Sequence, residues 1–136
     1  LRELLDVGIP KELVQLMDRF AEGQVFYEET PHAWLLKLPS ELTQREVLSD
    51  NFHIFMPAVH FMDLTDGRAI AYVSFAPNKF ERSYWWIAVG TPEGEAFRQG
   101  SVTVIAKGFV QFFQRLLGAD GRYYFDEPDF QPDVVL

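Results

Sequence analysis

The sequence predicts one α+β domain, a mostly antiparallel sheet flanked by an N-terminal helix and a C-terminal helix. Two runs rich in aromatic and β-branched residues, 68–75 and 83–90, are bounded by turn residues and are typical of paired antiparallel strands. Apolar residues recur at helical spacing near each end of the chain. A chain of 136 residues fits a single domain, which we expect to span residues 1–136 and to end in an acidic, aromatic tail over residues 119–136.

The N-terminal helix is predicted over residues 10–21. Pro10 falls where the first turn of a helix tolerates proline, and Gly23 supplies a stop after the last turn. The apolar residues between them have the i, i+3, i+4, i+7 spacing of one buried face; they are Leu13, Leu16, Met17 and Phe20.

Three predictions concern the stretch that precedes the central turn. Residues 33–38 predict a strand that ends at Pro39, and residues 40–48 predict a short helix with Ser40 at its start. Residues 53–56 are ambiguous because Pro57 interrupts them, and residues 58–64 predict a strand. Strict alternation along that strand places Val59, Phe61 and Asp63 on one face and His60, Met62 and Leu64 on the other.

The centre of the predicted sheet is the turn Asp66-Gly67 and the strand over residues 68–75. Alternate alanines along this strand, Ala69 and Ala71, favour close packing of a bulky element against that face. The expected cover is a helix with an apolar stripe from Phe109 to Leu117, ended by Gly118. The remaining segments are a loop over 76–82, a strand over 83–90, a loop over 91–100 with room for one short bridge at 96–97, and a strand over 102–105.

Composition narrows the function classes. The chain has no cysteine, which excludes disulfides and thiolate metal sites. No apolar run approaches the roughly twenty residues of a membrane-spanning helix, so we expect a cytoplasmic protein that does not bind membranes. The net charge of −8 argues against direct binding of nucleic acid and favours a basic partner. From residue 119 onward five acids stand against one base, which makes the tail acidic out of proportion to its length.

The sequence offers weak signals for catalysis. The three histidines, His32, His53 and His60, lack metal-site spacing, and a structural or surface role is favoured for each. A metal site or an acid–base pair would need two of them to meet beside Asp63 or Asp50. Nucleophile elbows, phosphate-binding loops and dinucleotide-binding glycine patterns are absent from the sequence. We therefore predict no catalytic residue, no cofactor and no metal.

The order of short motifs along the chain resembles that of the SUKH superfamily, the Smi/Knr-like domains. These motifs are Gly8-Ile9-Pro10 at a helix start, Leu38-Pro39-Ser40-Glu41-Leu42 after a strand, Asp66-Gly67 before residues 69–73, and Ile105-Ala106 before Phe109-Val110-Gln111-Phe112-Phe113. The resemblance implies an α+β fold without catalytic residues. Many bacterial relatives in that family look like immunity proteins that neutralise a toxin, often a nuclease, delivered between competing cells.

The leading hypothesis is accordingly an immunity-type, protein-binding domain that blocks a basic toxin domain through an acidic surface. Its candidate contact residues are Glu28, Glu29, Glu93, Glu95, Asp126, Glu127 and Asp129. Each of these acids has a simpler explanation, namely that it keeps the domain soluble. Two alternatives stay open: a regulatory adaptor or scaffold that binds several partners, and a small ligand-binding protein or enzyme that uses His32, His53 or His60. The oligomeric state is not predicted.

Overall fold

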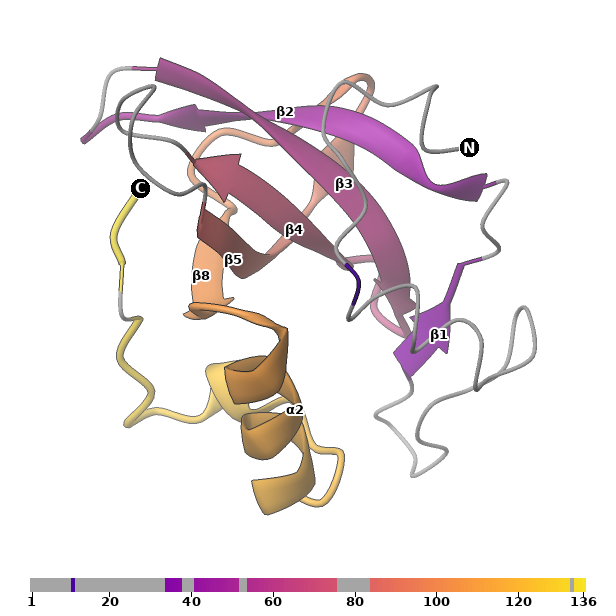
Figure 1. Cartoon of the computed structure of the whole chain (residues 1–136), viewed down its shortest axis with the longest axis vertical. Coiled ribbons are helices and arrows are strands. Elements are labelled where there is room, and N and C mark those ends of the chain that lie inside the picture. The colour runs from indigo at the N-terminus through magenta and orange to yellow at the C-terminus, as the bar shows by residue number, and fades with distance from the viewer. Residues whose placement is uncertain (1–10, 12–33, 38–40, 52–53, 76–83, 133) are drawn as a thin grey trace.

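The computed structural model describes residues 11, 34–37, 41–51, 54–75, 84–132 and 134–136. Within these ranges the chain is dominated by one eight-stranded sheet, with one helix and a short 3₁₀ turn near the C-terminus (Figure 1). The elements are β1 (Trp34–Leu36), β2 (Thr43–Ser49), β3 (Ile54–Leu64), β4 (Ala69–Phe75), β5 (Tyr84–Gly90), β6 (Pro92–Glu93), β7 (Ala96–Phe97), β8 (Thr103–Ala106), α2 (Phe109–Gly118) and η3 (Tyr124–Asp126).

The predicted α+β class with a helix at either end is therefore wrong. The described part of the chain is predominantly β, and α2 is the helix that flanks its sheet. The sheet is mixed, because β2 pairs with β7 in parallel while the other pairs are antiparallel. The predicted helix over residues 10–21 lies outside the described residues apart from Lys11. None of the described helices is long and apolar enough to cross a membrane.

The prediction of a short helix over residues 40–48 is also wrong, because Thr43–Ser49 form strand β2. All seven residues of β2 pair with β3, from Thr43 opposite His60 to Ser49 opposite Ile54. Val47 and Ser49 are buried while Glu46 is exposed, which is the alternation of a strand. Pairing across the sheet here overrides the local preference for helix. Pro57 has no backbone N–H to donate, but β3 tolerates it because the pairing with β4 begins only at Ala58. At Pro57 the strand is therefore paired on one side, with β2.

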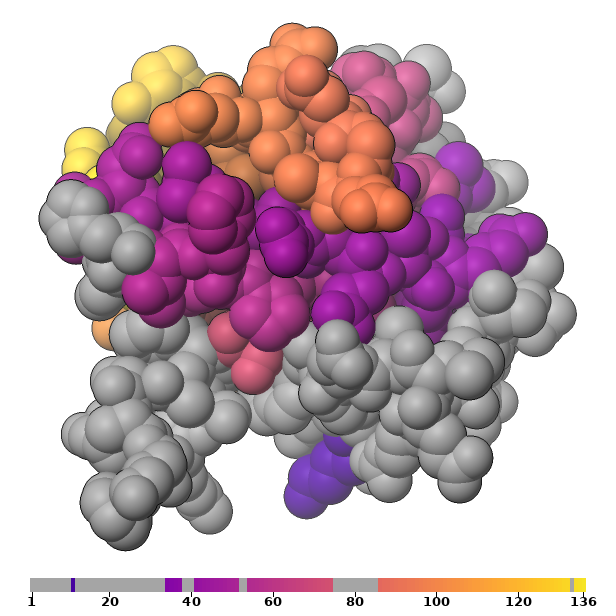
Figure 2. Space-filling model, turned by 90° about the horizontal axis from the view of Figure 1, so that it is seen from above, coloured from indigo at the N-terminus to yellow at the C-terminus, as the bar shows by residue number. Residues whose placement is uncertain are grey.

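The sheet curls into an incomplete barrel. Its strand order is β6-β7-β2-β3-β4-β5-β8, with β1 paired to the end of β3, so β5 and β6 lie near opposite edges. Only Thr91 separates β5 from β6 along the chain, and the two edges must therefore come together. Figure 2 shows the segment after β5, in orange, packed against β2 and β3, in purple and magenta.

The interior of the curl explains the alternate alanines of β4. Ala69, Ala71 and Val73 face a buried cluster to which β2, β3, β5, β7 and β8 also contribute. Small side chains are needed there because strands curled around a narrow interior leave little volume. The expected cover of this face by α2 is wrong: Phe97 of β7 fills it, and Val134 and Leu136 of the C-terminus pack against it.

Helix α2 covers the opposite face of the sheet. Phe109, Phe112 and Leu116 are buried against Ile70 and Tyr72 in a second, larger cluster. The helix predicted from this stripe is confirmed, but Leu117, which the prediction placed on the buried face, is exposed. The C-terminal chain then passes from this face toward the end of β2, where the side-chain amide of Asn51 donates to the carbonyl oxygen of Val135 at 3.0 Å (Figure 1).

A register irregularity in β3 changes the predicted faces of that strand. Between His60 and Met62 the pairing with β4 shifts, which is the signature of a bulge. Met62 and Leu64 consequently join Val59 in the cluster beneath α2, rather than lying on the face of His60. The same shift brings Asp63 beside His60, three residues away.

Gly90 allows the curl to close, and its substitution tests this feature. A Cβ atom at position 90 would lie 2.9 Å from Cδ1 of Phe97 and 3.0 Å from Cγ2 of Val102. Because Phe97 is held in the interior cluster, we expect Gly90→Ala to lower the free energy of unfolding by about 1–3 kcal/mol. Chemical denaturation of both proteins measures this. Gly118→Ala is the matched control, since a Cβ there meets nothing within 4 Å, and an equal loss in both variants would contradict the account.

Candidate functional site

The acidic tail predicted over residues 119–136 is anchored to the domain by its aromatic residues. Tyr123, Tyr124 and Phe125 are buried. Trp34 of β1 packs edge-on against Tyr123 and Phe125, and its indole nitrogen donates to the carbonyl oxygen of Gly121 at 2.7 Å. This hydrogen bond joins residues 87 positions apart in the sequence. The first part of the tail is therefore a fixed part of the structure and not a free arm.

Arg68 makes a second attachment. Its guanidinium forms two hydrogen bonds to the carboxylate of Asp126, at 2.8 and 2.6 Å, and also bonds Asp66. The guanidinium lies over the rings of Tyr123 and Phe125, at 5.8 and 5.2 Å from their centroids. Hydrogen bonding to Asp126 raises the pKa of Arg68 above its ordinary range. Burial alone would raise the pKa of Asp66, but its hydrogen bonds with Arg68 outweigh burial and lower it.

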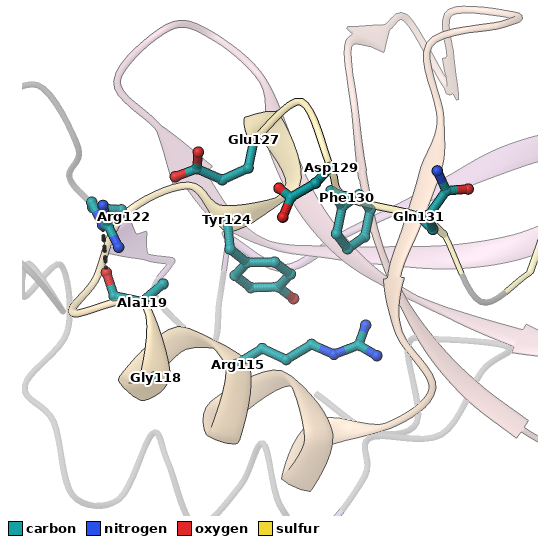
Figure 3. Close-up of a pocket in the computed structure, with 9 residues that line it drawn as sticks. All are labelled: Arg115, Gly118, Ala119, Arg122, Tyr124, Glu127, Asp129, Phe130 and Gln131. Carbon is teal, nitrogen blue, oxygen red and sulfur yellow. Dashed lines mark hydrogen bonds between the residues drawn. The ribbon is translucent and has the colours of Figure 1, made fainter.

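A groove lies between α2 and the residues that follow η3. Its volume is about 600 Å³ and it is open to solvent. Figure 3 shows Tyr124 and Arg115 between the helix and the C-terminal segment, which carries Glu127, Asp129 and Phe130. The lining residues are Arg115, Gly118, Ala119, Arg122, Tyr124, Glu127, Asp129, Phe130 and Gln131.

The floor of the groove is fixed by hydrogen bonds to the end of β8. The phenol of Tyr124 and the guanidinium of Arg115 each donate to the carbonyl oxygen of Ile105 at 2.8 Å. The ring of Phe130 packs edge-on against Tyr124, with centroids 5.7 Å apart, and stays partly exposed. An aromatic surface held in this way can receive a side chain without first becoming ordered, which lowers the entropic cost of binding.

The guanidinium groups that line the groove are hydrogen-bonded to backbone carbonyl oxygens, whereas its carboxylates have no cationic partner within the described residues. Arg115 donates to Ile105, and Arg122 donates to the carbonyl oxygen of Ala119 at 3.0 Å. Glu127 and Asp129 are exposed, and within the described ranges no cation pairs with either of them. These two carboxylates are therefore available to bind cationic groups of another molecule.

The structure separates the acids that the sequence proposed as contacts. Glu127 and Asp129 line the groove, whereas Asp126 is engaged by Arg68. Glu93 and Glu95 are exposed at the β6–β7 turn, and Figure 1 places that turn at the opposite end of the molecule from α2. Glu93 also pairs with Arg98 at 3.3 Å. Glu28 and Glu29 lie outside the described residues.

Sequence reasoning missed the other residues of the groove. The sequence signal closest to Arg115 is its place in the last turn of the predicted helix, which gives no information about the carbonyl it contacts. Phe130 and Gln131 come from an irregular segment without periodicity. Their convergence depends on the turn after α2, where Gly121 has a φ of 80° and Asp120 a φ of 53°.

The structure describes one of the three histidines, His60. His32 and His53 lie outside the described residues. His60 is 3% exposed and forms a hydrogen bond of 2.7 Å with Asp63, one of the two carboxylates considered from sequence. The pairing considered there needs a second histidine, and both other histidines lie outside the described residues. Among the described residues, no group of three or more histidine, aspartate or glutamate side chains is arranged to hold a metal ion.

Comparisons of the chain with family models, with curated proteins and with solved structures give no match. The resemblance to the SUKH superfamily therefore stays a prediction.

The ion pair of Arg68 predicts how firmly the acidic segment is held. Arg68→Gln should lower the free energy of unfolding by about 1 kcal/mol, because the pair is bidentate but partly exposed. Amide hydrogen exchange should accelerate at Asp126 and Glu127, whose N–H groups bond within the turn. Arg98→Gln, which breaks the exposed pair with Glu93, is the control and should change stability by at most about 0.5 kcal/mol. Unchanged exchange at Asp126 and Glu127 in Arg68→Gln would contradict the anchoring role.

Proposed function

We propose that this protein is a non-catalytic binding protein of the immunity type, which neutralises a basic toxin domain through its acidic C-terminal surface. The observation that carries the proposal is the state of Glu127 and Asp129. Both carboxylates are exposed and without a cation among the described residues, yet they lie on a segment fixed by Trp34 and Arg68. Charges held in place before binding are worth more to an interface than charges on a mobile arm.

The groove suits the side chain of a lysine or arginine from the partner. The aliphatic part of such a side chain would pack on Phe130, while its cationic head would bind Glu127 or Asp129. Arg115, on the helix, and Arg122, on the turn that follows it, would exclude a second cation from their part of the groove and so fix the orientation of the partner. Occupancy of the groove would place the bulk of this domain over the cationic surface of the toxin and block its substrate.

The charge of the whole chain supports the same mechanism at longer range. A net charge of −8, with a surplus of acids beyond residue 119, creates a negative field that speeds the encounter with a basic protein. Such steering weakens as salt is added, since the Debye length is about 10 Å at 0.1 M and about 3 Å at 1 M. The association rate should therefore fall with ionic strength.

The proposal is tested with the products of the neighbouring genes, among which we expect a basic toxin domain. Isothermal titration of the full chain with that domain should give tight binding, and Glu127→Gln with Asp129→Asn should weaken it about tenfold or more, since the bound cation loses both carboxylates of the groove. The matched control is Glu41→Gln with Asp50→Asn, which removes two exposed carboxylates outside the groove. In cells that express the toxin, the wild-type chain and the control double variant should protect, and Glu127→Gln with Asp129→Asn should protect less.

Equal weakening in the two double variants would show that net charge and not the groove governs binding. If the neighbouring gene products do not bind at all, and several unrelated proteins are captured weakly instead, the immunity proposal fails and the adaptor alternative takes its place.

A further inference from the structure

The proposed function does not use the polar cluster around His60 in the described sheet. His60 is buried in β3, and its Nε2 lies 2.7 Å from Oδ1 of Asp63. Its Nδ1 accepts a hydrogen bond from Nε of Arg45 in β2, at 3.3 Å. The bulge after His60 makes this arrangement, because residues three apart in a regular strand point to opposite faces.

Arg45 connects this histidine to the β6–β7 turn. One of its guanidinium nitrogens donates to the carbonyl oxygen of Gly94, between β6 and β7. The described backbone contacts of the turn with β2 are few: the N–H of Glu46 donates to the carbonyl oxygen of Glu95 at 3.0 Å, and β7 pairs with β2 only at Ala96. The link through Arg45 therefore adds a side-chain contact to these backbone contacts and to the burial of Phe97 in the interior cluster.

The donors around the ring fix the protonation state of His60. The Nε–H group of Arg45 can only donate, so Nδ1 must carry a lone pair, and Nε2 carries the proton that Asp63 accepts. The imidazole in this arrangement is neutral. Protonation would put a hydrogen on Nδ1, which abolishes the hydrogen bond from Arg45 and sets two cations against each other across 3.3 Å.

We propose that His60, Arg45 and Gly94 form a pH-operated latch that holds the β6–β7 turn closed near neutral pH and releases it on acidification. Release would reorient Glu93 and Glu95, which flank Gly94, and would open the interior cluster that Phe97 fills. The latch does not depend on the proposed toxin binding, because it involves none of the groove residues.

Three charged residues of the described part of the chain act on His60: Asp63 of β3, Arg45 of β2 and Lys37, which follows β1. Burial is the main cause that lowers the pKa of His60; the hydrogen bond and the charge of Asp63 act in the opposite direction, and the charges of Lys37, beyond β1, and of Arg45 lower it further. From β4 and β7 the ring is met by uncharged residues, Ala71 as pairing partner and Phe97 as ring neighbour. The folded state thus binds this proton less readily than the unfolded chain, whose histidine titrates near pH 6.5. The stability from neutral His60 is complete above about pH 6.5 and is lost as the pH falls through the lowered folded pKa.

Amide hydrogen exchange on the full chain tests the latch, with rates corrected for their intrinsic pH dependence. The amide of Glu46 in β2 donates to the carbonyl oxygen of Glu95 in the turn, so its exchange reports release of the turn. The amide of Arg98 donates to the carbonyl oxygen of Thr91 across the base of the β6–β7 hairpin and serves as an internal reference. Between pH 7.5 and pH 5 we expect the amide of Glu46 to exchange faster, by about tenfold for each unit by which the pKa of His60 differs between the closed and the open turn. In His60→Gln, which can keep both hydrogen bonds but does not titrate, this acceleration should disappear.

Two further variants separate the latch from a general loss of stability. Asp63→Asn removes the charge that favours the imidazolium, so the midpoint of the acceleration should move to lower pH. His32→Gln with His53→Gln leaves His60 untouched and should keep the wild-type midpoint. The proposal is overturned if wild-type exchange at Glu46 does not change with pH, if His60→Gln keeps the acceleration, or if Asp63→Asn leaves the midpoint in place.

Discussion

The hydrogen bond from the indole of Trp34 to the carbonyl oxygen of Gly121 fixes the chain that follows α2 onto the sheet. A buried donor of this kind must be satisfied, and here its partner lies in a turn whose backbone, at Asp120 and Gly121, has positive φ. The turn directs Tyr123, Tyr124 and Phe125 back into the cluster under α2. Together with the ion pair of Arg68 and Asp126, this attachment holds the second wall of the groove in place.

The rest of the fold follows from the curl of the sheet. Curling brings the β6–β7 turn against β2, puts alanines in the interior and leaves the other face of β4 to α2. The two clusters therefore have different characters: a narrow one with small side chains inside the curl, and a broad aromatic one beneath the helix. The groove adjoins the broad aromatic cluster beneath the helix, and the His60 latch lies at the rim of the narrow cluster inside the curl. Binding and pH response can therefore be tested with separate variants.

Local sequence pattern predicted most of the strands and α2, because alternation and helical spacing are properties of short segments. It failed where distant residues decide the conformation. Residues 43–49 form a strand because β3 pairs with them, and Asp63 meets His60 because a bulge shifts the register of β3. The acids at 127 and 129 could be chosen from sequence, but their separation from the ion-paired Asp126 could not. The contacts of Arg68, Arg115 and Phe130 could not be predicted from local pattern, since they form only when β4, β8 and the C-terminal segment meet.

We propose that the surface formed by residues 122–131 is where this protein meets a basic partner. Hydrogen–deuterium exchange of the full chain, measured alone and with a basic protein that co-purifies with it, locates that contact without any substitution. The account predicts that protection on binding is greatest over residues 122–131 and the last turn of α2. Protection confined to β2, β3 or the β6–β7 turn, with unchanged exchange over residues 122–131, would contradict it.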